Sequence, residues 1–93
     1  MNLNIKRSTK FKRDLKRAIS RGYNYELLRP IITKLANREP LPPENRDHPL
    51  SGDWTGCREC HIQADWLLIY RVRAEELELL LMRTGTHSDL FRE

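Results

Sequence analysis

The second half of the chain carries the side chains best suited to moving protons. His48, His61 and His87 are its only histidines, and each lies in a short segment rich in turn-forming residues. Asp65 follows His61 closely, and Arg83 precedes His87. Imidazoles change charge near neutral pH and a guanidinium binds phosphate oxygens, so this combination is suited to acid–base chemistry on a phosphate ester. We therefore take these five residues as candidate catalytic residues.

The first half of the chain is basic instead. The whole chain has 17 Lys and Arg against 13 Asp and Glu, a net charge of +4. Between positions 6 and 21, a single acidic residue, Asp14, opposes the basic ones. A charge asymmetry this strong favours a polyanion, or an acidic protein partner, over a merely solvated surface. The residues expected to contact nucleic acid are Lys6, Lys10, Arg13, Lys16, Arg17 and Arg21.

Length and composition predict one domain spanning residues 1–93. Hydrophobic residues make up 39% and charged residues 32% of the chain, which suits a globular protein with one small core. No apolar run approaches the roughly 18 residues of a membrane-spanning helix, so we expect no membrane contact. The N-terminal segment 1–6 lacks the apolar stretch of a secretory signal, which favours a cytoplasmic location.

The elements that position these residues begin with a strand and two helices. Alternation of polar and apolar residues from 2 to 6 predicts a short strand. Ser8 or Thr9 can cap a first helix that ends at Gly22, and a second helix follows. Pro30 lies inside the second helix, which must either start near it or bend. The two expected apolar stripes comprise Phe11, Leu15, Ala18 and Ile19, and then Tyr25, Leu28, Ile31, Ile32 and Leu35.

Strands follow in the second half of the chain. Residues 38–46 are rich in proline and are predicted to form a connecting loop. Three strands are predicted at 56–62, 66–73 and 77–83, joined as an antiparallel meander. A turn at 84–86 then leads to a short terminal helix or coil at 87–91. This order predicts the α+β class, a small and mostly antiparallel sheet with two N-terminal helices packed on it.

The predicted strands bring some of the candidate catalytic residues together. His61 ends one strand and Asp65 begins the next, so a hairpin places them close to each other. Arg83 and His87 flank a single Thr-Gly-Thr turn and can also approach each other. Periodicity does not show which sheet edges adjoin, so the convergence of all five residues is a hypothesis.

Metal and haem sites are disfavoured. Cys57 and Cys60 belong to a Cys-x-x-Cys-His motif, the spacing of haem attachment and of some zinc sites. On a regular strand these two positions point to opposite faces, so we expect two reduced cysteines that share no ion. The three histidines and Asp65 lack the close helical spacing of known metal motifs, and Arg83 beside them would repel a cation. We therefore expect no metal and no other cofactor.

Two aromatic residues are candidates for contact with nucleotide bases. Trp66 shares one strand face with the apolar residues at 68, 70 and 72 and is expected in the core. Trp54 lies in a turn flanked by glycines, and Phe91 lies near the end of the chain, where a large aromatic has less structural reason to exist. Both can stack on an unpaired nucleotide, and we take both as candidate substrate-binding residues.

Several linked segments resemble the YafQ branch of the RelE-type toxins. These are 47–56 (DHPLSGDWTG), 60–62 (CHI), 65–70 (DWLLIY) and 83–87 (RTGTH), followed by Leu90 and Phe91. The likeness covers nearly the whole chain in the same order. It implies an mRNA interferase of a type II toxin–antitoxin system, which enters the ribosomal A site and cuts mRNA during translation. It also implies functional roles for His48, His61, Asp65, Arg83, His87 and Phe91.

The residue types suggest how such a cleavage would proceed. RNA supplies its own nucleophile, the 2′-hydroxyl, and the enzyme must supply a base, an acid and a positive charge. We assign Arg83 to the phosphate and His87 to protonation of the leaving oxygen. Asp65 or His61 is the candidate base, and His48 could share either role. The expected product, formed without metal, is a 2′,3′-cyclic phosphate.

The implied partners are the ribosome with its mRNA and a cognate antitoxin. The basic face of the first helix would dock on ribosomal RNA, and an acidic antitoxin segment that folds on binding would cover it. We expect the toxin alone to be a monomer and to form a hetero-oligomer with the antitoxin. Two alternatives remain: a ParE-like inhibitor of DNA gyrase without nuclease activity, and a plain nucleic-acid-binding module.

Overall fold

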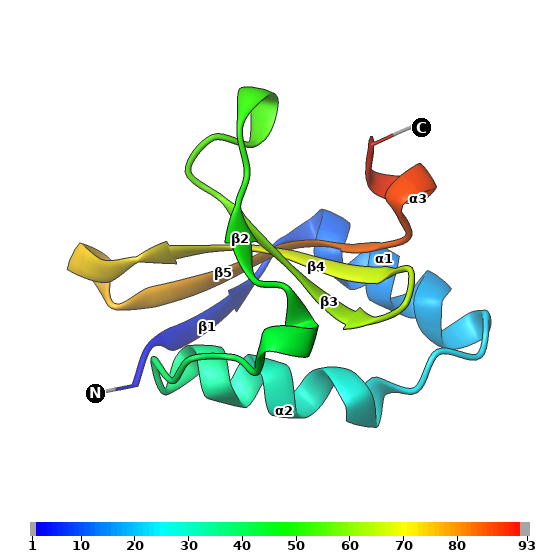
Figure 1. The fold of residues 1–93 in the computed structure, drawn as a ribbon, viewed down its shortest axis with the longest axis horizontal. Helices are drawn as coiled ribbons and strands as arrows, with labels where there is room; N and C mark the ends of the chain where they lie inside the picture. Colours follow the sequence, from blue (N-terminus) through cyan, green and yellow to red (C-terminus); the bar gives the residue numbers. More distant parts are fainter. Residues whose placement is uncertain (1, 92–93) are drawn as a thin grey trace.

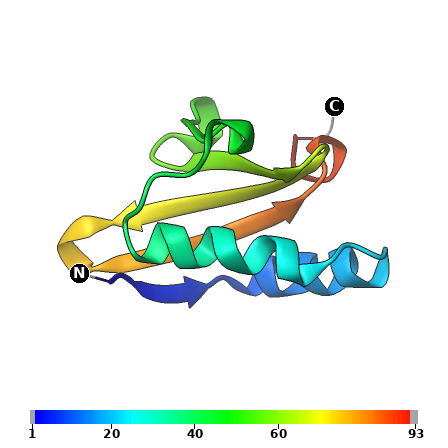
Figure 2. The same cartoon turned by 60° about the horizontal axis from the view of Figure 1, so that its bottom comes forward.

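A five-stranded sheet carries two long helices on one face, as the computed structural model of the chain shows for residues 2–91 (Figure 1). The sheet order is β1-β5-β4-β3-β2. Figure 2 shows α2 and, behind it, α1 beneath the sheet, with the segment around β2 above it. The elements are β1 Asn4–Arg7, α1 Thr9–Ser20, α2 Tyr25–Ala36, β2 His48–Pro49, β3 Arg58–Gln63, β4 Trp66–Arg73, β5 Glu78–Gly85 and α3 His87–Phe91.

The predicted α+β architecture is confirmed. Strands β3, β4 and β5 form the expected antiparallel meander, and the last two are joined by a 3₁₀ turn at Ala74–Glu76. Strand β1 pairs with β5 in parallel, so the sheet is mostly rather than wholly antiparallel. The short strand β2 was not predicted; it pairs His48 with Glu59 and Pro49 with Arg58 at the far edge.

Helix α1 begins at the predicted cap. The Ser8 hydroxyl accepts a hydrogen bond from the backbone N–H of Phe11 at 2.9 Å, and the helix ends just before Gly22, whose φ of +94° suits glycine. Its buried residues are Phe11, Asp14 and Ala18. The expected stripe is therefore wrong at Ile19, which is 50% exposed, because the helix turns Asp14 toward the sheet instead.

Helix α2 starts well before Pro30 and runs through it. The Asn24 side chain caps the helix by accepting from the backbone N–H of Glu26 at 2.9 Å. The alternative of a start near Pro30 is therefore wrong. Burial of the predicted apolar stripe outweighs the one backbone hydrogen bond that a proline cannot make. The buried residues of α2 are Leu28, Ile31, Ile32, Leu35 and Ala36.

Apolar side chains pack on both faces of the sheet. The larger cluster lies between sheet and helices and contains Trp66, as predicted, whereas Val72 from the same strand is 39% exposed. A smaller cluster on the opposite face contains Leu67 and Ile69, with Trp54, Met82, Leu90 and Phe91. Cys60 belongs to the first cluster and Cys57 to the second, on opposite faces as the strand geometry predicted, and both are free cysteines.

Helix α1 also covers the part of β5 that β1 leaves unpaired. The Ser8 hydroxyl donates to the Met82 carbonyl at 2.7 Å, and the Thr84 backbone N–H donates to Asp14 Oδ2 at 3.2 Å. These side chains thus replace a neighbouring strand at the end of β5 that leads into α3. Within residues 2–91, no helix is long and apolar enough to span a membrane.

Candidate active site

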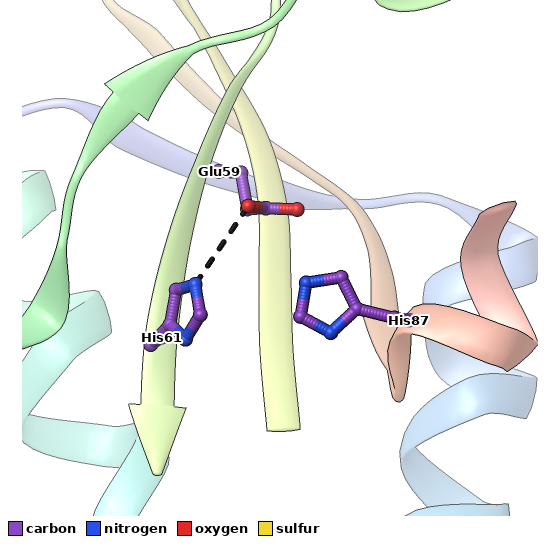
Figure 3. Close-up of side chains that lie close together, drawn as sticks. All are labelled: Glu59, His61 and His87. Carbon is purple, nitrogen blue, oxygen red and sulfur yellow. Dashed lines mark ion pairs between the residues drawn. The ribbon is translucent and has the colours of Figure 1, made fainter. Parts of the chain in front are cut away.

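Three side chains that can exchange protons meet on the sheet face away from α1 and α2. Glu59 and His61 alternate on β3 and so point to the same side, and His87 begins α3 (Figure 3). One nitrogen or oxygen atom from each lies within 4.8 Å of the other two. The rings of His61 and His87 are 5.8 Å apart between centroids, and His61 Nε2 is 3.9 Å from Glu59 Oε2.

Strand β2 adds His48 to the same carboxylate. Its Nδ1 lies 2.7 Å from the Arg46 carbonyl and its Nε2 lies 3.2 Å from Glu59 Oε2. A carbonyl only accepts, so Nδ1 carries a proton and Nε2 is the nitrogen that can exchange one with Glu59. The side chain of Glu59 is 6% exposed and that of His48 is 47% exposed. A buried carboxylate therefore connects a partly exposed imidazole with His61.

Asp65 holds His87, a partner that the hairpin argument did not predict, since it placed Asp65 beside His61. Its Oδ1 accepts from the backbone N–H of His87 at 3.0 Å and from Nδ1 at 2.7 Å. These two hydrogen bonds, the backbone one first, lower the pKa of Asp65. An ionised Asp65 fixes a proton on His87 Nδ1 and leaves Nε2 for another partner.

Helix α3 is held in place by a second aspartate. The Asp89 carboxylate accepts from the backbone N–H of Thr86 at 3.1 Å, and the Thr86 hydroxyl accepts from the backbone N–H of Asp89 at 3.1 Å. Arg21, the C-cap residue of α1, donates to the same carboxylate at 2.8 Å. The Thr86 N–H first, and then Arg21, lower the pKa of Asp89. The helix that carries His87 is thus fixed at its first turn.

Arg83 does not join the histidines. Its Nε and Nη2 donate to Asp14 at 2.6 and 3.0 Å, and these hydrogen bonds raise the pKa of Arg83. Within residues 2–91 it makes no hydrogen bond or ion pair to a histidine. It lines a cleft with Lys10, Arg13, Asp14 and Arg17. The predicted approach of Arg83 to His87 is therefore not seen as a contact.

The predicted basic residues divide into two groups. Three form ion pairs. Lys6 Nζ on β1 lies 4.0 Å from Glu78 Oε2. Arg17 Nη1 lies 4.0 Å from Asp89 Oδ1, and Arg21 Nη1 lies 2.8 Å from Asp89 Oδ2. The other three are exposed on α1 and, within the described part of the chain, form no ion pair: Lys10, Arg13 and Lys16. These three are the ones most available to an external anion.

The two aromatic candidates differ in their surroundings. Phe91 is half-buried, and its ring centroid lies 6.3 Å from that of His87. Trp54 is also half-buried and packs against the smaller apolar cluster with Leu67 and Ile69. The structure therefore places Phe91 beside the acid–base cluster and gives Trp54 a packing role on the same face.

An open cavity of about 330 Å³ borders this cluster at His61. Asn45 forms part of its wall and donates from Nδ2 to the His61 carbonyl at 2.7 Å. The remaining lining residues are Glu44, Arg46, Ile62, Gln63 and Ala64. His61 is thus reachable from outside despite a side-chain exposure of 15%.

The same cluster is also a possible donor set for a metal ion. Two imidazoles and a carboxylate are ligands that Zn²⁺ uses in open, catalytic sites, and imidazoles also suit copper. The set formed by Glu59, His61 and His87 differs from the one considered from sequence, since Glu59 takes the place of Asp65 and His48. The expectation of a metal-free enzyme stays a prediction.

Glu59 and Asp14 are the residues that the sequence analysis did not select. Glu59 had one available signal, its alternation with His61 on a predicted strand. Asp14 had another, because it is the single acidic residue of the basic segment and lies at helical spacing from Phe11 and Ala18. Neither signal specifies a partner, since Arg83 lies 69 residues after Asp14 and the fold alone brings His48 and His87 to Glu59.

Known proteins are similar to this chain over nearly its whole length. The model of the YafQ family, bacterial toxins of type II toxin–antitoxin systems, matches residues 3–92. The mRNA interferase toxin YafQ of Escherichia coli (strain K12) is 40% identical over 88 residues, which cover 94% of each chain.

Solved structures of such toxins have the same fold as this chain. A metal-bound toxin from Helicobacter pylori is 43% identical and superposes with a TM-score of 0.91, covering 96% of this chain and 99% of that one. The toxin of the E. coli DinJ–YafQ complex is 38% identical with a TM-score of 0.87, over 98% and 99% of the two chains. This chain therefore belongs to the YafQ family of type II toxin–antitoxin toxins.

Proposed function

We propose that this chain is an mRNA interferase, a toxin that cuts mRNA on the translating ribosome in the cytoplasm. The observation that carries the proposal is the convergence of Glu59, His61 and His87 within 4.8 Å on an accessible face. Groups that give and take protons at this separation are what a phosphodiester cleavage needs. The E. coli relative with 40% identity is named for this activity. The gyrase-inhibitor alternative has no support from the relatives.

The cluster supplies a base on one side and an acid on the other. A base among Glu59, His61 and His48 takes the proton of the 2′-hydroxyl as its oxygen attacks the phosphorus. The bond from phosphorus to the 5′-oxygen breaks, and this leaving oxygen takes a proton from His87, which Asp65 orients through Nδ1. The products are a 2′,3′-cyclic phosphate and a free 5′-hydroxyl, and no step requires a metal.

Charge and stacking complete the proposed site. Arg83 contacts the phosphate from the cleft beside α1, where two of its five N–H groups are already bonded to Asp14. Phe91 lies beside His87 and positions a neighbouring base by stacking. Trp54 contributes less to substrate binding than the sequence suggested, because it packs against the apolar cluster that supports α3.

The exposed basic face of α1 docks on ribosomal RNA in this proposal. Lys10, Arg13 and Lys16 form no ion pair within residues 2–91, so no such contact has to break when they bind a polyanion. An acidic segment of a cognate antitoxin covers the same face when the toxin is silent, and the E. coli relative is known in complex with DinJ. The toxin alone is a monomer and forms a hetero-oligomer with its antitoxin.

Primer extension on a defined mRNA, with and without translating ribosomes, tests the proposal. Wild type should give ribosome-dependent cuts, and His87→Ala should lose them while keeping its fold. Glu75→Ala, a change of an exposed residue in the turn after β4, is the matched control and should cut like wild type. No cuts by a wild-type toxin that still arrests growth would refute the proposal.

A further inference from the structure

Asp14 is a buried carboxylate that accepts three hydrogen bonds. Its side chain is 6% exposed, and that of its partner Arg83 is 20% exposed. Oδ2 accepts from Arg83 Nε at 2.6 Å and from the Thr84 backbone N–H at 3.2 Å, while Oδ1 accepts from Arg83 Nη2 at 3.0 Å. This carboxylate is therefore fixed to the backbone of β5 and fixes the plane of the guanidinium in turn.

The guanidinium of Arg83 keeps N–H donors that Asp14 does not bind. The two hydrogen bonds to Asp14 engage Nε and Nη2, and a guanidinium has further N–H groups on Nη1 and Nη2. The cleft that Arg83 lines holds three more cationic side chains against this one carboxylate: Lys10, Arg13 and Arg17. The local charge is therefore still strongly positive, and an RNA phosphate entering the cleft would meet Arg83 in a fixed orientation.

We propose that Asp14 is a positioning residue for RNA cleavage, which holds Arg83 so that its unpaired edge meets a phosphate of the bound RNA. This inference rests on the proposed interferase function. Asp14 touches no substrate atom itself. Its negative charge weakens overall attraction to RNA slightly, and its hydrogen bonds direct the strongest phosphate donor of the cleft. Asp14 thus improves the contact between Arg83 and the phosphate in the transition state. It does not strengthen RNA binding in the ground state.

A purely structural role for Asp14 predicts something different. In that case its loss would lower cleavage and ribosome binding together by loosening the fold, with or without Arg83. A positioning role affects the cleavage rate constant alone and acts only through Arg83. Asp14→Asn separates these possibilities, because an amide oxygen can still accept from the Thr84 N–H but the amide NH₂ cannot accept from Arg83.

The experiment measures single-turnover cleavage on programmed ribosomes for wild type, Asp14→Asn, Arg83→Ala and the double variant. A shift of about 1 Å in a positioning group can cost about 10²-fold, and Asp14→Asn keeps part of the contact, so we expect about a tenfold lower rate constant. The half-saturating ribosome concentration should stay the same or fall. The double variant should cleave at the rate of Arg83→Ala.

Two results would overturn the inference while leaving the interferase function standing. One is wild-type cleavage by Asp14→Asn, and the other is a double variant slower than Arg83→Ala by the full Asp14→Asn factor. If Asp14→Asn does not fold, Arg83→Lys serves instead, because it keeps the charge opposite Asp14 but loses the two-point contact. Wild-type cleavage by Arg83→Lys would equally overturn it. Absence of cleavage by wild type would refute the proposed function itself.

Discussion

Replacing Glu59 with glutamine tests whether its charge drives the acid–base chemistry. The carboxylate is 6% exposed, 3.2 Å from His48 Nε2 and 3.9 Å from His61 Nε2. Glutamine has nearly the same shape, so Glu59→Gln removes the charge with little change in packing. If a histidine takes the 2′-hydroxyl proton, the imidazolium that forms in the transition state loses its buried counter-charge.

The size of the effect follows from these distances. With an effective dielectric constant of about 20, the carboxylate attracts a unit positive charge by about 5 kcal/mol at the His48 distance and about 4 kcal/mol at the His61 distance. In the proposed mechanism a single imidazole, the base, gains charge in the transition state, and water screens the interaction, above all at His48, which is 47% exposed. About half of the attraction, about 2 kcal/mol, should be lost, which corresponds to a roughly 30-fold lower cleavage rate constant.

Single-turnover cleavage of a ribosome-bound mRNA measures this rate constant directly. Thermal unfolding should show a melting temperature within about 4 °C of wild type, because the change costs at most a few tenths of a kcal/mol in packing. The exposed Glu75→Gln provides the control for a lost carboxylate elsewhere. Cleavage by a folded Glu59→Gln variant at the wild-type rate would refute the assigned role of this charge.

Three further predictions concern stability, pH and metal. Asp14→Ala should lower the free energy of unfolding by about 3 kcal/mol and the melting temperature by about 15 °C, because it leaves the Arg83 guanidinium and the Thr84 backbone N–H without their partner. Thermal circular dichroism measures this change, and a decrease in melting temperature below about 5 °C would contradict the prediction. Hydrogen bonding to Thr86 and Arg21 lowers the pKa of Asp89, so its stabilisation is present above the ordinary value of 3.8 and is lost as the pH falls through the lowered one. The difference in melting temperature between wild type and Asp89→Asn should therefore shrink below pH 3.8, and a difference that stays constant would count against it. Toxin treated with EDTA and then freed of chelator should cleave normally on intact ribosomes, and activity restored only by added zinc or copper would show a required metal.

The sequence predicted the elements whose signal is local. Strand β4 occupies 66–73 as predicted, since its residues are apolar on both faces at its start and the flanking turns are well marked. Helix α1 begins at Ser8 and stops before Gly22 for the same kind of local reason, a cap and a glycine. The antiparallel meander followed from short connections alone.

The errors concern features that only tertiary contacts determine. Strand β2 has two residues, too few for any periodicity, and exists because His48 and Pro49 pair with β3. That pairing is what brings His48 to Glu59, so the missed strand and the missed carboxylate have one cause. The burial of Asp14 in place of Ile19 likewise depends on a partner almost 70 residues away in β5.

Helix α3 shows why the proposed site requires the whole fold. It has five residues and cannot persist alone in water, where isolated helices shorter than about 12 residues are marginal. Three contacts hold it in place: Asp65 from the β3–β4 turn, Arg21 at the C-cap of α1, and the apolar packing of Leu90. The orientation of His87 is therefore set before substrate arrives, and no ordering of α3 has to accompany catalysis. A loss at any of the three anchors should lower the cleavage rate constant more than it lowers global stability, because α3 places a single buried residue, Leu90, in the core.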